Sequence, residues 1–153
     1  MINGQVRYSA VWQQPGNISE VQVYGWSYED YRKKYDELWG QGWRLHILQP
    51  FVLNGTVLYS AVWRQMGNIP EIQLYGQSYE DFRRKYDELW NQGFRLQLIK
   101  PFKLADGALR YSVVFRQGNQ GELQLYNWSY NDYRQWYDQN WGGNWRLMSL
   151  EAY

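Results

Sequence analysis

The chain of 153 residues carries 16 Lys and Arg against 15 Asp and Glu, and it contains no cysteine. This balance gives no basic surface of the kind that binds nucleic acid, and the absence of cysteine excludes disulfides, thiolate metal ligands and cysteine nucleophiles. No apolar run approaches the roughly 20 residues of a membrane-spanning helix, and no basic segment followed by an apolar one opens the sequence. The length suits a single domain with a sizeable core.

The composition is polar and aromatic at once. Mean hydropathy is −0.74, yet 20% of the residues are aromatic, with 10 Trp and 15 Tyr. We therefore expect a core built from rings, whose N–H and O–H groups need partners or a wet edge. Aromatic, polar-flanked surfaces also suit sugars and peptides, so a binding role stays open.

Three copies of one sequence unit follow each other along the chain. The segment Tyr8-Ser9-Ala10-Val11-Trp12 recurs at residues 59–63 and, with two changes, at 111–115. The stretch 27–45 recurs at 78–96 and 129–147. We expect one domain of three repeats of about 51 residues each, with the boundaries 1–53, 54–105 and 106–153.

Each copy predicts a strand, a strand, a helix and a strand, in that order. Residues 5–13 and 20–24 alternate between apolar and polar side chains, and the loop between them suggests a hairpin. Ser27 is a good N-cap, and an apolar stripe of helical period follows it. Gly42 marks the helix end, where the third copy has Asn144. Residues 45–53 form the last strand, with Pro50 at an edge or a bulge.

The junctions between copies predict tight hairpins. Asn54-Gly55 and Asp106-Gly107 join the last strand of one copy to the first strand of the next. The chain opens with Asn3-Gly4 and one half of such a hairpin, and residues 147–153 form the other half. Because unpaired strand edges invite aggregation, we expect residues 147–153 to pair with 5–13. The predicted fold is α/β (α+β), with three ββαβ repeats closed into a pseudo-threefold ring with adjacent termini.

The Tyr-Ser-Ala-Val-Trp strand, the helix ending in Gly and the aromatic-Arg-Leu after it resemble the bacterial tandem repeat domain. They are also similar to the repeats in the N-terminal domain of fungal polyglycine hydrolases. The resemblance covers essentially the whole chain and implies a repeat fold and a secreted or extracellular location, without an assigned activity. In that family the repeats often lie beside a β-lactamase-like serine catalytic domain. In this sequence no Ser is followed three residues later by Lys, the spacing such enzymes use.

An arginine follows the helix in every copy, as Arg44, Arg95 and Arg146. One interpretation is structural, with each guanidinium capping carbonyls or pairing with an acid at the helix-to-strand corner. The other is an axial anion-binding site, in which the three arginines line the axis of the ring. The sequence leaves both open.

Other aromatic positions suit a ligand. Trp12, Trp63 and Phe115 lie in strands and are expected in the core, whereas Trp26 precedes a helix and Trp136 replaces a lysine on a polar helix flank. An exposed Trp is a typical anchor for a partner. The candidate ligand-binding residues are Tyr24, Trp26, Tyr75, Gln77, Tyr126, Trp128 and Trp136.

No catalytic or metal-binding constellation is evident. His46 is the single histidine and is not repeated, so neither a metal site nor serine–histidine chemistry is expected, and no cofactor is implied. We expect a non-enzymatic, monomeric repeat domain that acts as a structural or interaction scaffold. The close identity of the copies is typical of a consensus or designed protein, and equally of recent duplication. The alternative is a multivalent, lectin-like module that binds a glycan or a peptide at one site per repeat.

Overall fold

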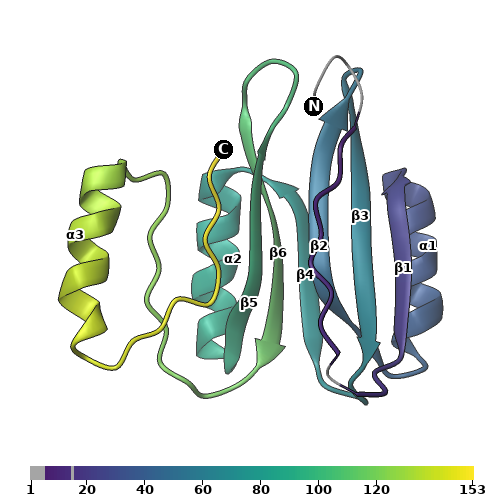
Figure 1. Ribbon diagram of the computed structural model, residues 1–153, viewed down its shortest axis with the longest axis horizontal. Coiled ribbons are helices and arrows are strands. Elements are labelled where there is room, and N and C mark those ends of the chain that lie inside the picture. Colours follow the sequence, from purple (N-terminus) through teal and green to yellow (C-terminus); the bar gives the residue numbers. More distant parts are fainter. Residues whose placement is uncertain (1–5, 15) are drawn as a thin grey trace.

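The computed structural model describes residues 6–14 and 16–153, and Figure 1 shows the arrangement of the elements. In chain order they are β1 (Glu20–Trp26), α1 (Tyr28–Trp39), β2 (Trp43–Leu53), β3 (Thr56–Gln65), β4 (Glu71–Gln77), α2 (Tyr79–Asn91), β5 (Phe94–Lys103), β6 (Leu109–Gln117) and α3 (Tyr130–Trp141). None of the helices in the described ranges is long and apolar enough to cross a membrane.

The strands form two antiparallel three-stranded sheets that lie side by side (Figure 1). Their strand orders are β1-β3-β2 and β4-β6-β5, so the outer strands of each sheet come from one sequence repeat and the central strand from the next. The structural unit is therefore strand, helix, strand, strand. We call residues 20–65 unit 1 and residues 71–117 unit 2. Each unit is displaced along the chain relative to the sequence repeat.

The hairpin predicted between the first two strands of a repeat is wrong. β3 and β4 belong to different sheets, because β3 already has β1 and β2 as neighbours and the segment 66–70 leads to the next sheet. The hairpin predicted at Asn54-Gly55 is confirmed. Both residues have positive φ angles, +50° and +79°, as a tight turn between twisted strands requires. Pro50 lies in β2, an outer strand, as predicted, and Pro101 lies at the same position of the outer strand β5.

The predicted helices and their caps are confirmed. The Ser27 hydroxyl accepts a hydrogen bond from the Asp30 amide at 3.1 Å and so begins α1. Tyr31, Tyr35 and Leu38 of the apolar stripe are buried against the sheet. The chain leaves the helix through Gly42, whose φ of +79° has its counterpart in Asn144 at +65°.

The three complete ββαβ repeats and the closed ring are not confirmed. We call residues 122–153 the third unit. Its helix α3 has the Ser129 cap, but none of its side chains is buried, and residues 118–153 contain no strand. Residues 6–14 form no strand either, and the Tyr8 ring packs 6.0 Å from that of Tyr24 in unit 1. Asn3-Gly4 and Gln5 lie outside the described residues, so adjacent termini stay a prediction.

Candidate functional site: the joint between units

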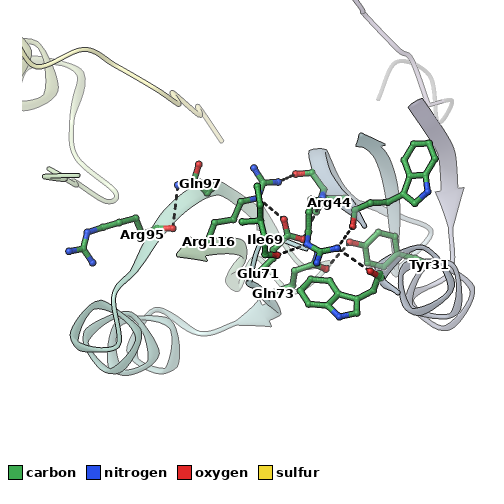
Figure 2. Close-up of polar contacts among 11 residues, drawn as sticks. Tyr31, Arg44, Ile69, Glu71, Gln73, Arg95, Gln97 and Arg116 are labelled. Atoms are coloured by element: carbon green, nitrogen blue, oxygen red, sulfur yellow. Dashed lines mark hydrogen bonds and ion pairs between the residues drawn. The ribbon is translucent and has the colours of Figure 1, made fainter. Parts of the chain in front are cut away.

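The most elaborate polar site lies where unit 1 meets unit 2 (Figure 2). Arg44, at the start of β2, is buried and points from unit 1 into this joint. Its Nε donates to the Ile69 carbonyl of the connecting segment at 2.5 Å, and its Nη1 donates to the carbonyls of Trp39 and Trp43. The guanidinium also stacks 3.7 Å from the centre of the Trp39 ring. One side chain thus closes the end of α1 and fixes the path to the next unit.

A buried ion pair completes the joint, and we call Glu71 and Arg116 the clamp. Glu71 Oε2 accepts from Arg116 Nε at 2.7 Å, and its Oε1 accepts from the Leu45 amide at 3.4 Å. Arg116 Nη2 donates to the Leu45 carbonyl. The clamp therefore binds both backbone groups of one residue in the neighbouring unit. Because the Glu71 side chain is fully buried, these partners are what makes its burial tolerable.

Tyrosines line the same joint. The Tyr31 hydroxyl of α1 lies 3.0 Å from the Tyr75 hydroxyl of β4 and 3.4 Å from Gln73 Oε1. The Tyr31 ring also stacks on Tyr59 and Trp63 of its own sheet. Burial raises the pKa of Tyr31 well above its ordinary value, and burial raises that of Tyr75 as well. Both hydroxyls therefore stay protonated and serve as hydrogen-bonding groups.

A second joint, between unit 2 and the third unit, repeats the first. Arg95 Nε donates to the Gln120 carbonyl at 2.9 Å, and Glu122 Oε2 accepts from the Leu96 amide at 2.9 Å. Arg83 Nη1 donates to Gln124 Oε1 at 3.1 Å. Burial raises the pKa of the Glu122 carboxyl, and the Leu96 amide opposes that shift. The arginine–carbonyl and glutamate–amide contacts of the first joint thus recur at the second.

The three arginines predicted as a possible axial site lie at helix-to-strand corners. Arg44 and Arg95 each direct donors to backbone carbonyls on both sides of a joint. Arg146 donates to the carbonyls of Trp141 and Trp145, and among the described residues no carbonyl across a joint accepts from it. Guanidinium groups that cap backbone carbonyls at helix-to-strand corners agree with the structural interpretation of these arginines. Anion binding by the triplet stays a prediction.

The candidate ligand-binding aromatics do not gather in one site. Tyr24, Trp26 and Trp128 are exposed, whereas Tyr75 and Tyr126 are half-buried in the two joints, and Gln77 is half-buried at the end of β4. Trp136, predicted to be exposed, is half-buried because its ring packs edge-on against Trp128 at 5.9 Å. Ligand binding at these positions stays a prediction.

Sequence reasoning missed the clamp. Its acidic residue recurs as Glu20, Glu71 and Glu122, and its basic residue as Arg64 and Arg116. That repetition was a usable signal, but nothing in the sequence pairs a strand with the following repeat.

No metal centre is evident among the described residues, since no group of three or more potential ligand side chains comes together there. His46 is half-buried in β2, and burial lowers its pKa. What the joints can do chemically is to hold neighbouring units in one orientation, through charged groups that bind backbone amides and carbonyls.

Comparison with known proteins places the chain in a family. A family model described as polyglycine hydrolase-like, structural repeat, matches residues 20–66 and 70–118, more than half of the sequence. These two segments coincide with units 1 and 2, so the family repeat is the strand-helix-strand-strand unit of the structure. No curated protein matches the chain. The chain therefore belongs to the polyglycine hydrolase-like structural repeat family.

Proposed function

We propose that this protein is a non-enzymatic structural scaffold, a pseudo-threefold ring in which residues 5–13 complete the third unit as its central strand. One observation carries the proposal. The third unit has a helix and both flanking segments but no central strand, while Trp12 of the matching sequence is 81% exposed elsewhere on the molecule. Its counterparts Trp63 and Phe115 are fully buried.

The groove of the third unit has the composition of a strand site. It has a volume of about 750 Å³, and its lining includes Leu96, Ile99, Tyr126, Tyr133, Tyr137 and Leu147. Tyr133 and Tyr137 occupy the repeat positions of Tyr31 and Tyr35. In unit 1 the Tyr31 ring stacks on the central strand. The same stacking partners, Tyr8 and Trp12, are present letter for letter in residues 5–13.

The backbone beside this groove already has the shape that a complete unit needs. In β1 and β4 the strand bulges at Gly25 and Gly76, whose φ angles are +63° and +61°. The amide of each bulge donates to a serine of the central strand, Ser60 or Ser112. Asn127, at the same position in the third unit, has a φ of +58°. Ser9 is the serine that would accept from it once residues 5–13 enter the groove.

A ring of this kind supports a scaffold role because the two joints share an arginine–carbonyl and a glutamate–amide contact between units. Each joint joins charged side chains to backbone groups of the neighbouring unit, and a closed set of three gives every unit a neighbour on both sides. The outer loops and helix faces then form a rigid surface for attached or bound partners. The family's structural repeat is in keeping with that role.

A disulfide test decides whether the strand enters the groove. The central strand of unit 1 places Val62 opposite Ile47, so by repeat position Val11 would lie opposite Ser149. We expect the double variant V11C/S149C, oxidised by dissolved oxygen in dilute solution, to form an intramolecular disulfide. The disulfide is seen as the loss of the mass of two hydrogen atoms and as the failure of a thiol reagent to label either cysteine. The matched control is V62C/I47C, whose partners are paired in the structure. Free thiols in the first variant, with a disulfide in the control, would contradict closure.

A further inference from the structure

We infer that, in a molecule whose ring is open, the outer face of unit 1 is a docking surface for the third unit of a second copy of this chain. This inference rests on the strand completion proposed above. We call this surface the docking face. It comprises the Ile18 carbonyl, Glu20, Gln22, Tyr24 and Arg64. Every member has a counterpart that makes a joint elsewhere in the same molecule.

The docking face contains an ion pair equivalent to the clamp, and this pair is more exposed than the clamp itself. Arg64 and Glu20 form an ion pair at 2.7 Å, the same pair as Arg116 and Glu71. The Arg64 and Glu20 side chains are each 29% exposed, against 13% and 0% for Arg116 and Glu71. In unit 2 the clamp binds the amide and the carbonyl of Leu45. In unit 1 the equivalent clamp faces solvent.

The third unit presents the matching half. Leu147 occupies the repeat position of Leu45 and Leu96, and its side chain is exposed. Arg146 occupies the position of Arg44 and Arg95, whose Nε atoms donate to carbonyls across a joint. By repeat position, the carbonyl for Arg146 is that of Ile18. The ion pair and its backbone target, and the arginine and its carbonyl target, are therefore all present on one chain, and Ile18, Glu20, Arg146 and Leu147 are exposed residues.

A surface and its complement on different parts of one molecule make a head-to-tail interface. Such an interface is satisfied within one chain if the units close, and otherwise by a second copy. Residues 6–14 precede β1 by a short connection, so their strand enters the groove of whichever molecule the docking face contacts. Exchange of a short, hinge-linked strand between identical chains is a low-cost route to assembly. When the ring of one chain is open, its docking face and strand therefore fit the third unit and the groove of a second copy.

Two full-length variants separate exchange between chains from closure within one. W12K disables the strand that enters the groove, and Y133K disables the groove. Each variant alone lacks one half of the interaction. In a mixture, Y133K supplies an intact strand with its docking face, and W12K supplies an intact groove. We expect each variant to sediment as a monomer and an equimolar mixture to form a 1:1 heterodimer in sedimentation velocity. Y133S serves as a second groove variant should Y133K fail to fold by circular dichroism.

The docking face is tested in the same assay. Adding E20Q to the groove variant removes the carboxylate that binds the Leu147 backbone, and we expect about tenfold weaker heterodimer formation. E29Q, an exposed helix position, is the matched control and leaves the affinity unchanged. No heterodimer from variants that are each less stable than the parent would overturn the inference and leave the proposed ring standing. No heterodimer from variants as stable as the parent would overturn both.

Discussion

The same ion pair occurs twice in this protein in different surroundings. Glu71 and Arg116 lie buried between two units and hold the backbone of Leu45, whereas Glu20 and Arg64 face solvent. The Arg64 hydrogen bond lowers the pKa of the Glu20 carboxyl, as expected for a carboxylate at a surface with one cationic partner. The difference between the two pairs is whether a preceding unit covers them.

This contrast separates what the repeat encodes locally from what its neighbours supply. Sequence and local geometry are alike in both pairs, and so are the caps of all three helices. Burial differs, and burial is what gives a charged pair its large effect on stability. Substitutions at matched repeat positions measure how far the stability of the two end segments depends on burial in the same way as that of the central joint.

The largest effect is expected at Trp63, which is fully buried in unit 1. Trp63→Ala should lower the free energy of unfolding by about 3–5 kcal/mol through lost contacts and a cavity, measured by urea denaturation. Trp63→Phe should cost much less, because Phe115 fills this position in unit 2 and the buried Trp63 Nε1 has no hydrogen-bond partner among the described residues. Under strand completion Trp12→Ala costs more than about 1 kcal/mol; a change below this would contradict the proposed ring.

The clamp comes next. Glu71→Gln leaves the Arg116 guanidinium largely buried without its counter-charge, so we expect a loss of about 3 kcal/mol in the free energy of unfolding. Replacing both residues, as E71Q/R116M, should recover part of this loss because no unpaired charge remains buried. The measurement is a double-mutant cycle by chemical denaturation. Additive single effects would show that the two side chains do not act as a pair.

Smaller losses of stability are expected at the glycines that follow α1 and α2. Gly42 and Gly93 both have φ near +80°, so an alanine at either position is strained by about 1 kcal/mol. At Gly42 an added Cβ would also lie 3.1 Å from Gln65 Nε2 and 3.2 Å from Gly67 Cα. At Gly93 an added Cβ would meet no other part of the described chain within 4 Å. We expect G42A to lower the thermal midpoint more than G93A. G93N should be the mildest of the three, since Asn144 adopts this conformation in the third copy. Equal midpoints for G42A and G93A would argue against close packing at Gly42.

Local features were predictable from the sequence, and pairings between distant segments were not. Caps, the Gly42 exit and the Asn54-Gly55 hairpin depend on residues within a few positions of each other, so each could be predicted correctly. β4 pairs with β6, a strand of the next sequence repeat. The alternation of apolar and polar residues in this segment, as in the equivalent residues 20–24, predicts a strand but does not indicate its pairing partner.

The candidate site shows the same limit. The sequence indicates a structural role for Arg44 because an arginine recurs at the same helix-to-strand corner in every copy. The sequence does not predict that Arg44 binds the Ile69 carbonyl, because any residue can supply a backbone carbonyl. The clamp was missed for a related reason: Glu71 binds the amide of Leu45, and a backbone partner leaves no mark on the sequence.

The mildest change, Tyr31→Phe, tests the tyrosines of the joint. Phe82 fills this position in unit 2, so the ring is tolerated, and at pH 7 the loss of the bond to Tyr75 should cost about 1 kcal/mol.

Alkaline pH sharpens this test. Burial raises the pKa of Tyr31 above its ordinary value of 10.0 and that of Tyr59 to about 12, so the native state keeps protons that the unfolded chain has lost. Stability is then fully present below about pH 10 and falls as pH rises toward 12. Removing the Tyr31 hydroxyl removes its share of this fall, so we expect the Y31F curve of thermal midpoint against pH to be flatter between pH 10 and 12. Y130F, exposed on α3, should follow the parent protein. Parallel curves for Y31F and the parent would show that the Tyr31 hydroxyl is not buried in solution, and hence that units 1 and 2 do not form the joint.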